Sequence, residues 1–253
     1  MIDVLGILTR TWLGFAPLMG TPAAGSAAAQ VSAPASPVDA KTAVQNVQKF
    51  YTDISRVTAQ FRQSVKNATF GTAKDSDGTV WLSKPGKMRW DYLEKKPSGT
   101  VVKKSFLSDG KTLYVVDHGN KQVVKKDVKT DLLPVAVTFL YGTGDLNKDF
   151  NPEIDKTGTY GTKGDVVLKL TPKTPSAQYK ALYLVADPTN FHVKESIIVD
   201  SSDNVNHFRF FAPDFEKPIK DSLFEFTPAS VPTYRVIDAD QQAGSAAGKH
   251  DLQ

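Results

Sequence analysis

The spacing of apolar side chains predicts one helix followed by many strands. From residue 40 onward apolar residues recur at intervals of three or four, and Asp39 precedes them as a candidate N-cap. After residue 55 the interval becomes two, so Val57 and Ala59 point to one side of a strand and Thr58 to the other. The apolar stripe of the predicted helix comprises Val44, Val47, Tyr51 and Ile54.

Alternating segments separated by turn residues then predict a meander of antiparallel strands. Two turns are indicated by Pro85-Gly86 and by Asp109-Gly110, a strong hairpin signal. In the strand after the first turn, alternation places Met88 and Trp90 on one face and Arg89 on the other. The predicted strands cover residues 79–83, 87–92, 104–108, 112–117, 166–170, 181–186, 192–200, 205–211 and 224–226.

One apolar segment interrupts the strands. Residues 131–141 are nearly all apolar, with Asp131 as a candidate N-cap and Pro134 in the first turn. This pattern predicts a short helix. Because the segment also contains β-branched residues, a buried strand is the alternative. A second short helix is predicted for residues 145–150. The elements together indicate a curved sheet with helices covering one mouth.

The two ends of the chain differ from its middle. Residues 1–29 combine an apolar run with Ala27 and Ala29, the small-residue pattern of a signal peptidase site, and we expect a signal peptide there. A disordered N-terminal extension is the alternative. We expect a flexible linker over residues 30–40, a folded domain over 41–238 and a disordered tail over 239–253, which is rich in Gly, Ala and Gln.

The residue inventory offers little catalytic chemistry. The 253 residues include no cysteine, which excludes thiol nucleophiles, cysteine-ligated zinc and disulfides. The four histidines form no metal-binding pattern, and no phosphate-binding loop or serine elbow occurs, so we expect neither an enzyme nor a metal or cofactor. The formal net charge is +4, but the lysines are scattered over predicted strands and turns, which argues against nucleic acid.

Several motifs follow one another in a distinctive order. The helix leads into residues 57–63 (VTAQFRQ), which are followed by residues 78–92 (GTVWLSKPGKMRWDY). Residues 108–114, the apolar segment with Pro134, and the closing residues 224–228 (FEFTP) complete the series. No single motif is decisive, but their order and spacing over residues 41–238 are specific, and in them the chain resembles the LolA family of periplasmic outer-membrane lipoprotein carriers.

The resemblance implies a mainly β fold of the α+β kind: an incomplete, half-open antiparallel β-barrel with a helical lid over an apolar cavity. The residues that would bind lipid are Phe61, Trp81, Met88, Trp90, Val135, Ala136, Val137, Phe139 and Leu140. The other covering helix would contribute Val47, Tyr51 and Ile54. The family has an Arg at the position of Lys84, and this Arg holds the lid closed. A lysine lacks the planar set of donors of a guanidinium group, so we expect Lys84 to hold the lid more loosely. Alternatively, Arg89 takes over part of this role.

The resemblance also implies a function without catalysis. Such a chaperone binds the acyl chains of lipoproteins released by an inner-membrane ABC-type complex and delivers them to an outer-membrane acceptor such as LolB. We therefore expect a monomer in the periplasm of a Gram-negative bacterium. The absence of a cysteine for lipid attachment favours the detachable carrier over the anchored acceptor. The alternative is an envelope β-domain with a filled core that binds other lipids or a protein partner without transferring lipoproteins.

Overall fold

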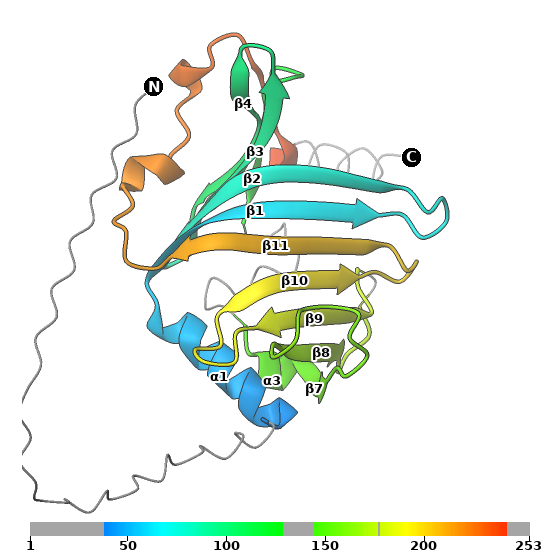
Figure 1. The fold of residues 1–253 in the computed structure, drawn as a ribbon. Helices are drawn as coiled ribbons and strands as arrows, with labels where there is room; N and C mark the ends of the chain where they lie inside the picture. Colours follow the sequence, from blue (N-terminus) through cyan, green and yellow to red (C-terminus); the bar gives the residue numbers. More distant parts are fainter. Residues whose placement is uncertain (1–37, 129–143, 177, 242–253) are drawn as a thin grey trace, which may run out of the picture. The chain divides into compact units, whose positions relative to one another are not determined.

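The described residues form one twelve-stranded sheet with a helix packed against it. The computed structural model describes residues 38–128, 144–176 and 178–241. The strand order is β12-β6-β5-β4-β3-β2-β1-β11-β10-β9-β8-β7, as Figure 1 shows for most of its strands. All neighbours are antiparallel except β12, which pairs with β6 in parallel. The strands at the two ends of this order, β12 and β7, do not pair, so the sheet is open, and the expected half-open, mainly β architecture is confirmed.

The elements have the following bounds, with two short 3₁₀ turns labelled η. The helices and turns are α1 (Ala40–Asp53), α3 (Leu146–Asp149), η2 (Asp221–Phe224) and η3 (Pro228–Ser230). The first six strands are β1 (Arg56–Lys66), β2 (Ala73–Ser83), β3 (Lys87–Lys96), β4 (Gly99–Asp109), β5 (Thr112–Asp117) and β6 (Gln122–Asp127). The last six are β7 (Phe150–Ile154), β8 (Val166–Pro172), β9 (Ala181–Ala186), β10 (Val193–Val199), β11 (Val205–Asp214) and β12 (Arg235–Asp238).

Helices α1 and α3 each begin at an aspartate N-cap. The Asp39 carboxylate accepts a hydrogen bond from the backbone N–H of Thr42 at 3.0 Å, which satisfies one of the otherwise unpaired donors of the first turn of α1. Asp145 caps α3 in the same way. The predicted helix over residues 145–150 is thus confirmed for Leu146–Asp149, whereas Phe150 already belongs to β7.

The meander is confirmed, with three differences at its margins. Phe224–Phe226 is not a strand: Phe224 ends the turn η2, which packs against β3 and β4, and its ring is 1% exposed. The prediction was wrong because the aromatic residues bury against a face of the sheet and not within its hydrogen-bonded ladder. Strands β7 and β12 are additional; both are short, and β12 has no apolar alternation, whereas β7 contains a proline at its centre.

The two faces of the sheet are covered differently. We call the face that carries Val57, Phe61 and Trp90 the inner face; α1 packs against its β7–β8 end. On the opposite, outer face, residues Phe226 to Tyr234 cover Leu107, Val116 and Val123. At the other end of the outer face Tyr160 covers Val167, Val185 and Ile197. The loop that precedes β8 is held by Asp165. This carboxylate accepts hydrogen bonds from Lys194 Nζ at 2.7 Å and from the Thr162 N–H at 2.9 Å.

Several predictions concern residues outside this description. They are the signal peptide (1–29), the linker up to residue 37, and the apolar segment 131–141 with its lid residues Val135, Ala136, Val137, Phe139 and Leu140. Of the predicted tail, residues 239–241 are described and are helical. Within the described part of the chain, no helix is both long enough and apolar enough to cross a membrane.

Candidate apolar binding face

Strand register assembles the predicted lipid-binding residues on the inner face. Residues directly opposite each other on antiparallel strands point to the same side of a sheet. The rows across β1, β2 and β3 are Val57–Leu82–Met88, Ala59–Val80–Trp90 and Phe61–Gly78–Tyr92. Phe61, Met88 and Trp90 are 1%, 1% and 5% exposed, respectively. Three of the residues named from the resemblance therefore lie together, as period-two alternation requires.

Aromatic rings form the centre of this face. The ring centroid of Phe61 lies 5.1 Å from that of Trp90 and 5.0 Å from that of Tyr92, both at steep interplanar angles. Phe208 on β11 lies 5.5 Å from Trp90, and Phe210 follows on the same strand at 6.2 Å. Such edge-to-face pairs add about 0.5 to 1.5 kcal/mol each beyond the burial of apolar area.

Glycine at position 78 makes room for the Phe61 ring. A Cβ atom on Gly78 would lie 2.3 Å from Phe61 Cζ and 2.3 Å from the backbone oxygen of Asp91. No side chain can occupy that position while the ring stays in place. The centre of the inner face therefore depends on a residue that contributes no side chain to it.

The list of site residues derived from the sequence omitted Tyr92, Phe208 and Phe210. Their signal was available, because Phe208 and Phe210 alternate with His207 and Arg209 along a predicted strand. What the sequence did not provide is the pairing of β11 with β1, two strands that are far apart in the sequence, with Lys66 paired to Val205, and become neighbours only in the folded sheet.

Two named residues lie on the outer face. Trp81 alternates with Val80 and Leu82, and its cross-strand partners are Thr58 and Arg89. Trp81 therefore does not lie with the other named lipid-binding residues. Side chains alternate along a strand, so a residue next to an inward-facing one points outward. Trp81 contributes to an outer-face cavity of about 290 Å³ beside Leu223.

Arg89 holds the C-terminal segment to the outer face. Its Nε lies 2.9 Å and 3.0 Å from the two carboxylate oxygens of Asp91, and its Nη1 donates to the Leu223 carbonyl at 3.3 Å. Ser105 Oγ donates to the same carboxylate at 2.7 Å. The structure thus places Arg89 at η2, across the sheet from α1, where it does not take over the latching position of Lys84.

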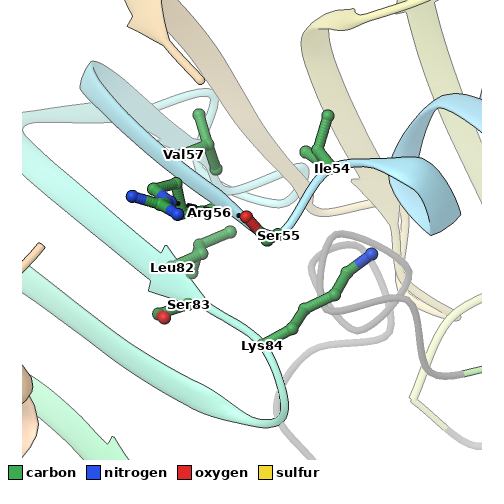
Figure 2. Close-up of a pocket in the computed structure, with 7 residues that line it drawn as sticks. All are labelled: Ile54, Ser55, Arg56, Val57, Leu82, Ser83 and Lys84. Carbon is green, nitrogen blue, oxygen red and sulfur yellow. Dashed lines mark hydrogen bonds between the residues drawn. The ribbon is translucent and has the colours of Figure 1, made fainter. Parts of the chain in front are cut away.

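Lys84 binds the C-terminal end of α1. Its ammonium group donates to the backbone carbonyls of Tyr51 and Thr52, the latter at 3.0 Å. Figure 2 shows the Lys84 side chain reaching from the turn after β2 toward that helix end, past Ile54. The last carbonyls of a helix lack intrahelical partners, and the helix dipole favours a cation there. Burial lowers the pKa of Lys84, although Asp53 nearby acts in the opposite direction.

Tyr51 forms a second attachment of α1. The hydroxyl oxygen of this buried tyrosine accepts a hydrogen bond from the Val193 N–H on β10 at 3.0 Å, and burial raises the pKa of the phenol. Val47 lies on the same helix and is completely buried, whereas Ile54, the C-cap, is half-buried. The helix is therefore attached to the sheet by an apolar stripe and by a few polar bonds near its C-terminal end.

The described residues pack closely where α1 meets the inner face. The cavity between Tyr51, Val57, Val80 and Phe215 is about 20 Å³, and the notch drawn in Figure 2 is about 10 Å³. Such volumes hold about one water molecule. Neither of these two cavities is large enough to admit an acyl chain.

The centre of this face suits the binding of an apolar ligand. Its side chains around Phe61 and Trp90 are aliphatic and aromatic. Among residues 38–128, 144–176 and 178–241, no cluster of three or more His, Asp or Glu side chains could hold a metal ion. An apolar face of this kind suits a ligand with hydrocarbon chains.

Comparison with known proteins points in the same direction. The family described as outer membrane lipoprotein carrier protein LolA matches residues 52–227 of the chain. A protein from Cupriavidus necator named outer-membrane lipoprotein carrier protein is 28% identical over 189 residues, which cover 73% of this chain and 83% of the relative. A protein of the same name from Chromobacterium violaceum is 26% identical over 213 residues, covering 84% and 94%. Among solved structures, a LolA superfamily protein from Nitrosomonas europaea is similar at a TM-score of 0.39 and 13% identity, covering 75% of this chain and 99% of the other.

Proposed function

The chain belongs to the LolA family of outer membrane lipoprotein carriers, and from this premise we propose that it is a periplasmic chaperone for the acyl chains of lipoproteins. In this proposal the carrier receives lipoproteins released from the inner membrane by an ABC-type complex. It shields their acyl chains across the periplasm of a Gram-negative cell and hands them to an outer-membrane acceptor such as LolB. The protein acts as a monomer and catalyses no reaction.

The observation that carries the proposal is the inner face itself. Phe61, Met88 and Trp90 lie together, buried, on one face of an open sheet, and the helix against this face is fixed by a small number of polar bonds. Burial of each CH₂ group of an acyl chain contributes about 0.8 kcal/mol, so such a surface gains substantially from binding a long chain. We propose that the apolar residues Val135, Ala136, Val137, Phe139 and Leu140 add to this site.

Release requires that a competing interaction replaces the bound chain. The bonds from Lys84 to the end of α1 supply such an interaction, because they form when α1 packs against the sheet. A ligand shifts this equilibrium only by its difference in affinity for the two arrangements. A carrier that binds and releases therefore needs an attachment of intermediate strength.

Two tryptophans on adjacent strands allow a matched test. We would titrate a short peptide carrying two palmitoyl chains at its N-terminal residue into the protein and into its Trp90→Ala and Trp81→Ala variants. Trp90 lies on the inner face and Trp81 on the outer face. We expect Trp90→Ala to weaken binding at least about tenfold, equivalent to about 1.4 kcal/mol, and Trp81→Ala to leave it within about twofold.

Thermal unfolding and circular dichroism would establish that both variants fold. Phe139→Asp provides a second variant that does not depend on the described core, and it should also weaken binding. Equal affinity of all four proteins would contradict the proposal. Binding of palmitate or phospholipid without any binding of the acylated peptide would favour the envelope domain for other lipids.

A further inference from the structure

The inner face changes character along strand β1. Its inward residues run Val57, Ala59, Phe61, Gln63 and Val65; the first three are 7%, 4% and 1% exposed, whereas Val65 is 42% exposed. With a rise of about 3.3 Å per residue, Val57 and Val65 lie about 26 Å apart. The end near Val57 is closed by α1, and the end near Val65 is open.

A cavity of about 500 Å³ lies at the open end. Its lining comes from the ends of β1, β10 and β11 and includes Asn67, Tyr179, Ile198, Asn204 and Asn206. Ile198, Asn206 and Val65 occupy one cross-strand row on the inner face, whereas Lys66 and Val205 occupy the next row, which points outward. The cavity therefore lies at the rim of the sheet, where the inner face ends. Tyr179 and Ile198 also pack against the main apolar cluster, so the cavity adjoins that cluster directly.

Neutral amides form part of the polar lining of this cavity, and one of them, Asn206, is bonded to Gln63, which is not itself a lining residue. Gln63 Nε2 donates to Asn206 Oδ1 at 2.8 Å, and this leaves the Gln63 oxygen and the Asn206 nitrogen without a partner among the described residues. One group accepts and the other donates, which is the pairing that a peptide bond requires. We call the surface formed by Asn206 of the lining and the adjacent Gln63 the amide mouth. The other two asparagines serve the turns, where Asn67 Oδ1 accepts from the Phe70 N–H and Asn204 Oδ1 from the Ala68 N–H.

The lining contains two charged residues, Asp200 and Lys66. Asp200 accepts hydrogen bonds from the backbone N–H groups of Ser202 and Asn204 at 2.8 Å and 2.9 Å, and from the Asn204 side chain at 2.9 Å, so its carboxylate serves the β10–β11 turn. Lys66 is the one lining residue with a positive charge. Phosphate recognition in proteins uses several charged donors, often the arginine fork, and the lining contains no arginine.

We propose that the amide mouth binds the neutral peptide backbone next to the acylated residue of the ligand, while the acyl chains extend from it toward α1. This inference rests on the proposed function and adds an orientation and a head-group preference. The apolar end then receives hydrocarbon, and the amide end receives the linkage groups and the first peptide bonds. The rest of the cargo polypeptide would leave through the open end at the β1–β2 and β10–β11 turns.

A double variant separates the mouth from the apolar face. Gln63→Leu combined with Asn206→Leu replaces both members of a hydrogen-bonded pair by apolar groups of similar size, which is close to neutral for folding. Gln60→Leu is the matched control, since Gln60 lies on the same strand, on the outer face, and is exposed. Each protein would be titrated with the dipalmitoylated peptide, with palmitate and with phosphatidylglycerol vesicles.

The double variant should bind the acylated peptide about tenfold or more weakly, the effect of losing one or two hydrogen bonds, and palmitate within about twofold. Gln60→Leu should bind both as the unchanged protein does. Equal peptide affinity of the double variant and the unchanged protein would overturn the inference, as would an equal loss for peptide and palmitate. A loss for phosphatidylglycerol alone would also overturn it, in favour of a phospholipid head group. Failure of the unchanged protein to bind any acyl ligand would instead contradict the proposed function.

A second measurement uses the unaltered protein. A nitroxide label on the second peptide residue of the ligand should broaden the backbone NMR signals of residues 65–67 and 204–206. Signals of residues 54–57, at the end of the face closed by α1, should remain sharp. The reverse pattern would place the head group at α1 and overturn the orientation even if the double variant behaved as expected.

Discussion

Replacing Lys84 by methionine should lower stability and raise ligand affinity at the same time. The substitution keeps a long, unbranched side chain and removes the ammonium group that binds the Tyr51 and Thr52 carbonyls. A hydrogen bond with one charged partner contributes about 1.5 to 3 kcal/mol when shielded, and a cation at a helix C-terminus about 0.3 to 1 kcal/mol. Lys84 is partly exposed, and water can replace it at the carbonyls. We therefore expect a loss of about 1 to 2 kcal/mol in the free energy of unfolding.

The same free energy should appear in ligand binding with the opposite sign. The cavity of about 20 Å³ beside Tyr51 is too small for an acyl chain, so binding there requires displacement of α1. Weakening the attachment by 1 to 2 kcal/mol makes the displaced arrangement about 5 to 30 times more populated, and the apparent dissociation constant should fall by up to that factor. Lys84→Arg, which restores the planar fork of donors, should shift affinity the other way.

Urea unfolding and titration with a fluorescent fatty acid would measure the two quantities. Lys49→Met is the control, because Lys49 lies on α1 itself. Lys49 pairs with Asp53 at 2.6 Å, but both side chains are more than half exposed, so removing the Lys49 ammonium group should change the free energy of unfolding by about 0.5 kcal/mol or less. If Lys84→Met loses stability while its ligand affinity stays the same or falls, the attachment of α1 does not oppose binding and the reasoning fails.

Three further substitutions test the framework of the site. Gly78→Ala should lower the free energy of unfolding by about 2 to 3 kcal/mol, since the new Cβ would overlap the Phe61 ring. In a double-mutant cycle with Phe61→Ala, measured by urea unfolding, the two effects should be non-additive, and additivity would contradict the close contact. Tyr51→Phe should cost about 1 to 2 kcal/mol in thermal unfolding because it leaves a buried β10 N–H unpaired, and an unchanged melting temperature would refute this. Burial alone would raise the pKa of Asp165, but the hydrogen bonds from Lys194 and Thr162 together lower it by more, so the pKa of this carboxyl lies below its ordinary value. Its stabilisation is therefore present above the unfolded pKa near 3.8 and disappears as the pH falls through the lower folded value, so Asp165→Asn should flatten the acid-unfolding curve below about pH 4; an unaltered curve would count against the pair.

Local sequence patterns were sufficient for most of the strands and for α1. The alternation of Met88 and Trp90 with Arg89 correctly assigns the two faces of β3, because side chains on a strand alternate whatever the tertiary context. The N-cap at Asp39 marks the start of α1 for a similarly local reason.

The patterns failed where tertiary contacts decide the outcome. The short strand β12 depends on its parallel partner β6, more than a hundred residues earlier, and Phe224 is buried against a face that no local pattern indicates. Trp81 was assigned to the apolar site from the family resemblance, but its neighbours Val80 and Leu82 occupy the inward positions of the strand. Whether such a residue reaches the apolar site is decided by the face of the strand on which it lies and not by its residue type.

The carrier function is tested most directly by what the protein binds in the cell. We would purify the full chain from the periplasm without detergent and analyse it by native mass spectrometry, followed by peptide and lipid identification. The account predicts a population of one-to-one complexes with acylated lipoproteins, reduced in the Trp90→Ala variant and unchanged in Trp81→Ala. Complexes with phospholipid alone or with a protein that carries no acyl chain would contradict it.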